Sequence, residues 1–167
     1  MFLTGFMGSG KTTVGRLLAE RLRLPFVDLD GAIEGAAGLS VRKIFERGGE
    51  GLFRRLEHDA LVAAVEGSPE AVIATGGGTP TLERNLRVLE EAGVSVWLDP
   101  PFSLIAQRIG ALGKRDRPLF DTDAQALELY RRRLPVYRRA DLRIEVDPAE
   151  SPEEVASRIV LLLEGAA

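Results

Sequence analysis

The stretch Gly5-Phe6-Met7-Gly8-Ser9-Gly10-Lys11-Thr12 reads G-x-x-x-x-G-K-T, and it lies between a short apolar segment and a helical pattern. Its glycines allow backbone angles and close approaches that side chains forbid, so successive N–H groups can point at phosphate oxygens. The N-terminus of the following helix directs its positive dipole end to the same place. The stretch is therefore predicted to bind nucleotide phosphates through Gly8, Ser9, Gly10, Lys11, Thr12 and Thr13.

Two side chains of this loop have predicted roles of their own. Lys11 is expected to reach the outer phosphates, and the Thr12 hydroxyl to join the shell of a Mg²⁺ ion. A match this short can arise by chance, and a Gly/Ser turn before a helix needs no ligand. The strand pattern before the loop and the helix pattern after it favour phosphate binding.

Composition limits the function classes that remain. The 167 residues suit one domain, 1–167, and the net charge of −3 argues against a nucleic-acid-binding protein. Without cysteine there can be no disulfide, thiolate metal site or cysteine nucleophile, which is compatible with a reducing compartment. No apolar stretch approaches the ~20 residues that cross a bilayer. We expect a cytoplasmic monomer with no nucleic-acid or membrane partner.

Short apolar segments alternate with helical ones, which is typical of an α/β fold with a parallel sheet covered on both faces. Strands are predicted at 1–4, 25–28, 71–75, 94–98 and 142–146. Segment 71–75 is almost entirely apolar, as in a central strand, whereas 142–146 alternates like an edge strand. Ser151, Pro152 and Glu154 predict the capped start of a closing helix.

Two carboxylates end the second predicted strand, in Pro25-Phe26-Val27-Asp28-Leu29-Asp30. In an open parallel sheet the carboxyl ends of the strands line the ligand crevice, which places both near the phosphate loop. Asp28 is predicted to hold water around the magnesium ion, and Asp30 to accept a hydrogen bond or a proton from a substrate hydroxyl. The alternative for Asp30 is a simple N-cap of the next helix.

Three glycines, Gly76, Gly77 and Gly78, directly follow the central strand. They would expose backbone N–H groups and leave room for a substrate, although a loose turn into a helix begun by Pro80 and Thr81 is the alternative. Their position favours a substrate site.

Arginines and a charged stretch complete the candidate site. Arg54 and Arg133 lie in basic runs, where a guanidinium fork could bind a carboxylate, but spacing alone does not select them from solvated neighbours. The stretch from Leu112 to Asp123 has the make-up of a mobile lid, about 110–124, with Arg117 as a cation for the transferred phosphoryl group. His58 is expected to be exposed rather than catalytic.

The chain resembles the shikimate kinases, which are small P-loop enzymes related to nucleoside monophosphate kinases. The resemblance covers essentially the whole chain. Its motifs are G-F-M-G-S-G-K-T-T-V-G at 5–15, D-L-D at 28–30, F-R-R-L-E at 53–57, G-G-G at 76–78, R-P-L at 117–119 and R-L-P-V-Y at 133–137.

The resemblance implies a three-layer fold whose five strands have the order 2-3-1-4-5, with a substrate-binding region at about 31–60. It also implies ATP-dependent phosphorylation of the 3-hydroxyl of shikimate, with Asp30 as the base and Lys11 and Arg117 on the phosphates. Arg54 and Arg133 would bind the shikimate carboxylate with help from Gly77, Glu57 would orient Arg54, and Arg108 would stack on adenine.

Two alternatives remain at this point. A kinase of another small acid such as gluconate also combines a phosphate loop with a compact lid. A nucleotide-binding regulator without catalysis would commonly lack part of the acceptor or metal machinery, whereas Lys11, Thr12, Asp28 and Asp30 are all present.

Overall fold

The computed structural model describes residues 1–112 and 122–165, and within them five parallel strands form one sheet in the order β2-β3-β1-β4-β5. The strands are β1 (Phe2–Thr4), β2 (Phe26–Asp28), β3 (Val72–Ala74), β4 (Ser95–Asp99) and β5 (Leu142–Glu145). The helices of the same residues are α1 (Lys11–Leu22), α2 (Leu29–Ala37), α3 (Val41–Gly67), α4 (Glu83–Ala92), α5 (Phe102–Leu112), α6 (Asp123–Tyr137) and α7 (Pro152–Gly165), with a 3₁₀ helix η1 (Thr79–Thr81).

The predicted strands and their order are confirmed, with ends that differ by one residue at most. β3 lies between β1 and β2 and is fully buried, whereas β5 pairs with β4 at the edge. The helix expected to begin at Pro80 starts later: residues 79–81 form η1, and α4 begins at Glu83.

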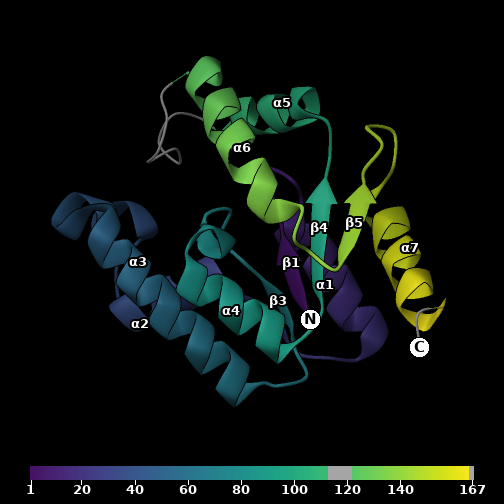
Figure 1. The fold of residues 1–167 in the computed structure, drawn as a ribbon, viewed down its shortest axis with the longest axis horizontal. Coiled ribbons are helices and arrows are strands. Elements are labelled where there is room, and N and C mark those ends of the chain that lie inside the picture. Colours follow the sequence, from purple (N-terminus) through teal and green to yellow (C-terminus); the bar gives the residue numbers. More distant parts are fainter. Residues whose placement is uncertain (113–121, 166–167) are drawn as a thin grey trace.

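Helices cover both faces of the sheet (Figure 1). Successive strand residues point to opposite faces, so Phe2 packs in the cluster beneath α2, α3 and α4, while Leu3 packs with α1 and α7. A third cluster, which includes Phe6, Trp97 and Tyr137, joins α5 and α6 to the carboxyl end of the sheet. Burial on both faces therefore fixes the strand ends from which the functional loops emerge.

The start of the closing helix α7 matches its predicted capping box. Glu154 N donates to Ser151 Oγ over 3.2 Å, and Ser151 N donates to the Glu154 carboxylate over 2.7 Å. Among residues 1–112 and 122–165, none of the helices combines the length and the apolar character that a membrane span requires.

Candidate active site

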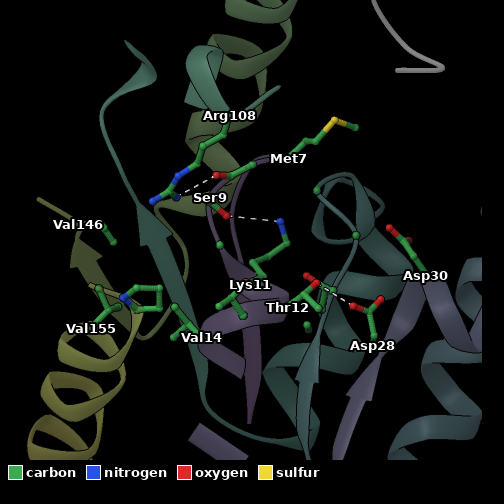
Figure 2. Close-up of a pocket in the computed structure, with 18 of the residues that line it drawn as sticks. Met7, Ser9, Lys11, Thr12, Val14, Asp28, Asp30, Arg108, Val146 and Val155 are labelled. Atoms are coloured by element: carbon green, nitrogen blue, oxygen red, sulfur yellow. Dashed lines mark hydrogen bonds between the residues drawn. The ribbon is translucent and has the colours of Figure 1, made fainter. Parts of the chain in front are cut away.

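A cavity of about 530 Å³ opens at the carboxyl ends of β1, β2 and β3. Its walls come from the loops that follow these three strands, from the first turns of α1 and α2, from α5, and from the segment between β5 and α7 together with the start of α7. Figure 2 shows the labelled side chains arranged around Lys11. This is where ligands bind in open parallel α/β sheets, because the loops that leave the strand ends converge there.

The loop between β1 and α1 has the backbone of a phosphate cradle. Gly8 and Gly10 have φ of 78° and 100°, in the left-handed region that favours glycine. Gly10 is the N-cap of α1, which places the free N–H groups of the first helical turn at the cavity. The predicted phosphate-binding residues all line the cavity: Gly8, Ser9, Gly10, Lys11, Thr12 and Thr13.

Lys11 is held inside this loop by the chain itself. Its ammonium donates to the carbonyl oxygens of Gly5 and Phe6 over 2.8 and 2.9 Å. Burial lowers the pKa of Lys11 to about 8, with Asp30 opposing the shift. The side chain is therefore a cation at neutral pH, positioned at the centre of the loop.

A side-chain hydrogen bond links Asp28, at the end of β2, to Thr12 at the start of α1. The Thr12 hydroxyl donates to Asp28 Oδ2 over 2.8 Å, and Asp28 Oδ1 accepts from Gly31 N over 3.3 Å. Asp28 is thus the N-cap of α2, and the alternative that assigned this cap to Asp30 is wrong because α2 begins at Leu29, two residues before the Gly31 start that an Asp30 cap requires.

The donor pair Thr12 and Asp28 suits a magnesium ion, since a hydroxyl and a carboxylate are the hard oxygen ligands that Mg²⁺ prefers. Within the described ranges, no group of three or more His, Cys, Asp or Glu side chains is arranged to hold a metal. A magnesium ion at Thr12 and Asp28 would therefore rely on water and substrate phosphates for its other ligands, as is usual for this ion.

Asp30 lies in the cavity wall, in the first turn of α2 and two residues beyond the cap, with its side chain open to the cavity. Partial withdrawal from solvent raises the pKa of Asp30 to about 6, although the positive charge of Lys11 opposes the shift. Figure 2 shows Asp28 and Asp30 on the same side of Lys11. A carboxylate with a pKa slightly below neutral is ionised and well matched to accept a proton.

The triple-glycine turn brings the predicted acceptor groups together. A Cβ added at Gly76 would lie 3.2 Å from Asp30 Oδ1, and one at Gly78 would lie 2.8 Å from Arg54 Cζ. Asp30, Gly76 and Gly77 line the cavity, and Gly78 packs directly on the Arg54 guanidinium beside it. Glycine is therefore needed here for close approach rather than for backbone freedom, because none of the three has a positive φ.

Arg54 is fixed by two glutamates. Its Nη1 donates to Glu57 Oε2 over 2.8 Å, and its Nη2 donates to Glu50 Oε1 over 3.0 Å. The Glu57 side chain is 0% exposed, whereas that of Glu50 is 58% exposed. Because an exposed ion pair contributes little, the bond to Glu57 fixes the direction of the guanidinium.

Arg133 reaches the same turn from α6. It is buried, a Cβ added at Gly77 would lie 3.4 Å from its Nη1, and its Cζ lies 5.6 Å from the centre of the Phe6 ring. On the same helix, the Tyr137 hydroxyl donates to the Gly77 carbonyl over 2.5 Å. The glycine turn therefore has an arginine on each side.

The other side of the cavity is less polar. Arg108 of α5 donates to the Gly8 carbonyl over 3.1 Å, and the walls beyond it include Val146, Pro152 and Val155. Figure 2 shows Arg108, Val146 and Val155 away from Asp28 and Asp30, with Lys11 between the two groups. The cavity thus has a mainly apolar side, which also includes Glu150, and an acidic side with Asp28 and Asp30. Arg117 and most of the predicted lid at 110–124 lie outside the described residues.

Sequence reasoning missed the buried polar residues behind the glycine turn. Thr79 and Asn85 are 0% exposed, and Tyr137 is 1% exposed. The expectation that His58 is exposed is wrong, because it is half-buried with Nδ1 2.8 Å from Asn85 Oδ1. The signal that could have identified such residues is a polar side chain at a helix position that the apolar pattern predicts to face the core.

Comparison with known proteins identifies close relatives along nearly the whole chain. The family model described as shikimate kinase matches residues 7–164. A shikimate kinase from Ruegeria pomeroyi is 42% identical over 164 residues, which cover 96% of this chain and 83% of the relative. The structure of a shikimate kinase from Acinetobacter baumannii in complex with shikimate has a TM-score of 0.92 at 36% identity, covering 99% of this chain and 92% of that one. A gluconokinase from Sinorhizobium meliloti, at 19% identity and a TM-score of 0.58 with 99% and 95% coverage, shares the fold alone.

Proposed function

This chain belongs to the shikimate kinase family, and from that premise we propose how its own residues divide the work of the reaction. The activity is ATP-dependent transfer of the γ-phosphoryl group to the 3-hydroxyl of shikimate, which gives shikimate 3-phosphate and ADP. The observation that supports the division of roles most directly is the presence of Asp30 and Lys11 in one cavity with the phosphate loop.

The loop and the apolar side of the cavity are proposed to bind ATP. Backbone N–H groups of Gly8, Ser9 and Gly10 would bind the phosphates, with Thr13 at the edge of the cradle. Lys11 would exchange its carbonyl partners for phosphate oxygens. Arg108, which already reaches the loop, would contact the adenine.

We propose Mg²⁺ as the cofactor, held by the Thr12 hydroxyl directly and by Asp28 through water, because these two side chains are already joined at 2.8 Å. When bound, the ion neutralises charge on the β- and γ-phosphates. The chain's own part is to hold the Thr12 and Asp28 oxygens on the side of the loop that faces Asp30.

The acidic side of the cavity is proposed to bind shikimate. Arg54 and Arg133 would bind its carboxylate, and the turn at Gly76, Gly77 and Gly78 would lie against its ring. Asp30 would accept the hydroxyl proton as the acceptor oxygen attacks phosphorus. A site built to pair with a carboxylate rejects acids or alcohols that lack one of these groups, because its buried polar atoms would stay unpaired.

Three further parts of the proposal rest on the resemblance and on composition. Arg117 would bring a positive charge to the transferred phosphoryl group. We also propose that the enzyme acts as a monomer and in the cytoplasm, since a chain without cysteine is compatible with a reducing compartment.

The roles can be separated with Asp30→Asn, which keeps the shape of the side chain and removes the base. The kcat should fall by about 10²- to 10⁴-fold while the KM for ATP stays nearly unchanged. Asp59→Asn, an exposed carboxylate on α3, is the matched control and should behave like the wild type. An equal loss of ATP affinity in Asp30→Asn would refute the base assignment, and preferential turnover of gluconate in a coupled assay would refute the acceptor assignment.

A further inference from the structure

A chain of buried polar side chains runs behind the glycine turn, outside the groups to which the proposed function gives a chemical role. Glu57, Thr79 and Asn85 are all 0% exposed, and they come from α3, η1 and α4. Thr79 Oγ1 donates to Glu57 Oε1 over 2.7 Å, and Asn85 Nδ2 donates to the Thr79 carbonyl over 3.1 Å. Buried polar groups are costly without partners, so each of these bonds constrains its neighbours.

Each hydrogen bond in this series of buried side chains has a definite donor and a definite acceptor. Because the Asn85 amide nitrogen donates to Thr79, its oxygen must be the atom that accepts, which makes His58 Nδ1 the donor at 2.8 Å. The Thr79 hydroxyl has one hydrogen and gives it to Glu57. The other Glu57 oxygen then accepts from Arg54 Nη1 over 2.8 Å.

Glu57 depends on this arrangement because it is a buried carboxylate with one charged partner. Its two oxygens are divided between Arg54 and Thr79, so the hydroxyl supplies the second of its bonds. Without that hydroxyl, Glu57 Oε1 would have to find another donor, and the carboxylate would rotate towards the guanidinium. The direction of Arg54 would change with it, since Glu50 offers only an exposed pair.

The same threonine also fixes the glycine turn. Thr79 N donates to the Gly76 carbonyl over 3.1 Å, and a Cβ added at Gly76 would lie 3.1 Å from both Thr79 Oγ1 and Glu57 Oε1. One residue thereby sets the position of the turn and, through Glu57, the plane of the guanidinium that packs on Gly78.

We propose that Thr79 is a positioning residue for the acid substrate: its hydroxyl fixes Glu57 and through it Arg54, while Asn85 and His58 hold Thr79 in place. The inference rests on the proposed role of Arg54 in carboxylate binding. Thr79 contacts neither substrate in this scheme and acts only through the arginine.

The test compares Thr79→Val, which removes the hydroxyl at nearly constant shape, with Thr79→Ser, which retains it. Steady-state kinetics should show the shikimate KM raised about tenfold in Thr79→Val, the equivalent of about 1.4 kcal/mol. The KM for ATP should stay within about twofold of the wild type, and Thr79→Ser should restore most of the loss. Thr4→Val, another buried threonine, is the matched control for loss of a hydroxyl from the core.

Two further measurements separate positioning from a general loss of packing. Shikimate methyl ester lacks the carboxylate, so Thr79→Val should bind it as the wild type does and should discriminate less between acid and ester. In an Arg54→Ala background, Thr79→Val should add no further loss, because residues that act through one another are not additive.

The outcomes are distinguishable. A wild-type shikimate KM and acid-to-ester ratio in folded Thr79→Val would overturn the inference, as would an equal rise in both KM values. If Arg54→Ala itself leaves the shikimate KM unchanged, the proposed carboxylate site fails instead. Thermal unfolding identifies a misfolded Thr79→Val. In that case Asn85→Leu, which removes the support of the Thr79 carbonyl, should raise the shikimate KM alone, and a wild-type value would refute the proposal.

Discussion

Gly78→Ala tests how closely the glycine turn and Arg54 are fitted to each other. The backbone of Gly78 is in the right-handed helical region, with φ of −98° and ψ of −9°, so alanine brings no backbone strain. The new methyl group would lie 2.6 Å from Arg54 Nη1 and closer still to Nη2, so the guanidinium must recede by more than roughly 0.8 Å to reach the 3.4 Å at which ordinary contact begins. Such a shift breaks or lengthens the 2.8 Å bond to Glu57.

We expect Gly78→Ala to weaken the binding of shikimate and not that of ATP. Loss of one charge-assisted bond of about 1.5–3 kcal/mol corresponds to a rise of about 10- to 150-fold in the shikimate KM, and the ATP KM should hardly change. Coupled steady-state kinetics with each substrate varied in turn provides the measurement. Gly35→Ala on α2 is the control, because a Cβ there meets nothing within 4 Å. A Gly78→Ala enzyme with wild-type shikimate KM would refute the close fit of turn and arginine.

Other predictions concern the charged groups of the cavity. At subsaturating ATP, kcat/KM should rise as pH increases through about 6, where Asp30 loses its proton and can act as a base, and fall above about 8, where Lys11 loses its charge. A pH–rate series checks this, and a flat profile between pH 5 and 7 would contradict the base. Arg133→Ala should raise the shikimate KM by about tenfold or more and the ATP KM far less, as measured by kinetics; unchanged acid binding would remove Arg133 from the site. Asp28→Asn should raise the Mg²⁺ concentration required for half-maximal rate, and an unaltered magnesium titration would argue against its role.

The phosphate loop and its acidic neighbours could be predicted from sequence because their signals are local. A glycine-rich loop needs particular backbone angles, and Gly8 and Gly10 adopt them. Asp28 and Asp30 were placed correctly from one rule, that the ends of parallel strands share one edge of the sheet. The sequence did not show which of the two residues is the N-cap of the following helix, because that depends on whether the helix begins at residue 29 or later.

The arginine pair could not be selected by spacing, because partners distant in sequence distinguish the two residues. Arg133 is buried beneath Phe6, while Arg131 and Arg132 beside it are exposed, as expected of solvated helix faces. Arg54 differs from the exposed Arg55 by facing Glu57. Only the family resemblance selected Arg54 and Arg133. The polar chain through Thr79 escaped prediction for the same reason, since its bonds join three separate elements.

The glycine turn also packs directly against the phosphate loop. A Cβ added at Gly77 would lie 3.2 Å from Met7 N and 3.4 Å from the Gly5 carbonyl, and Arg133 stacks on Phe6 of the same loop. The segments proposed to bind ATP and shikimate therefore pack directly against each other. An inhibitor that links an adenine nucleotide to a cyclic acid through a tether of fixed length would bind both proposed sites at once without a rearrangement of either. A tether one atom too short or too long would lose the advantage of joining the two groups.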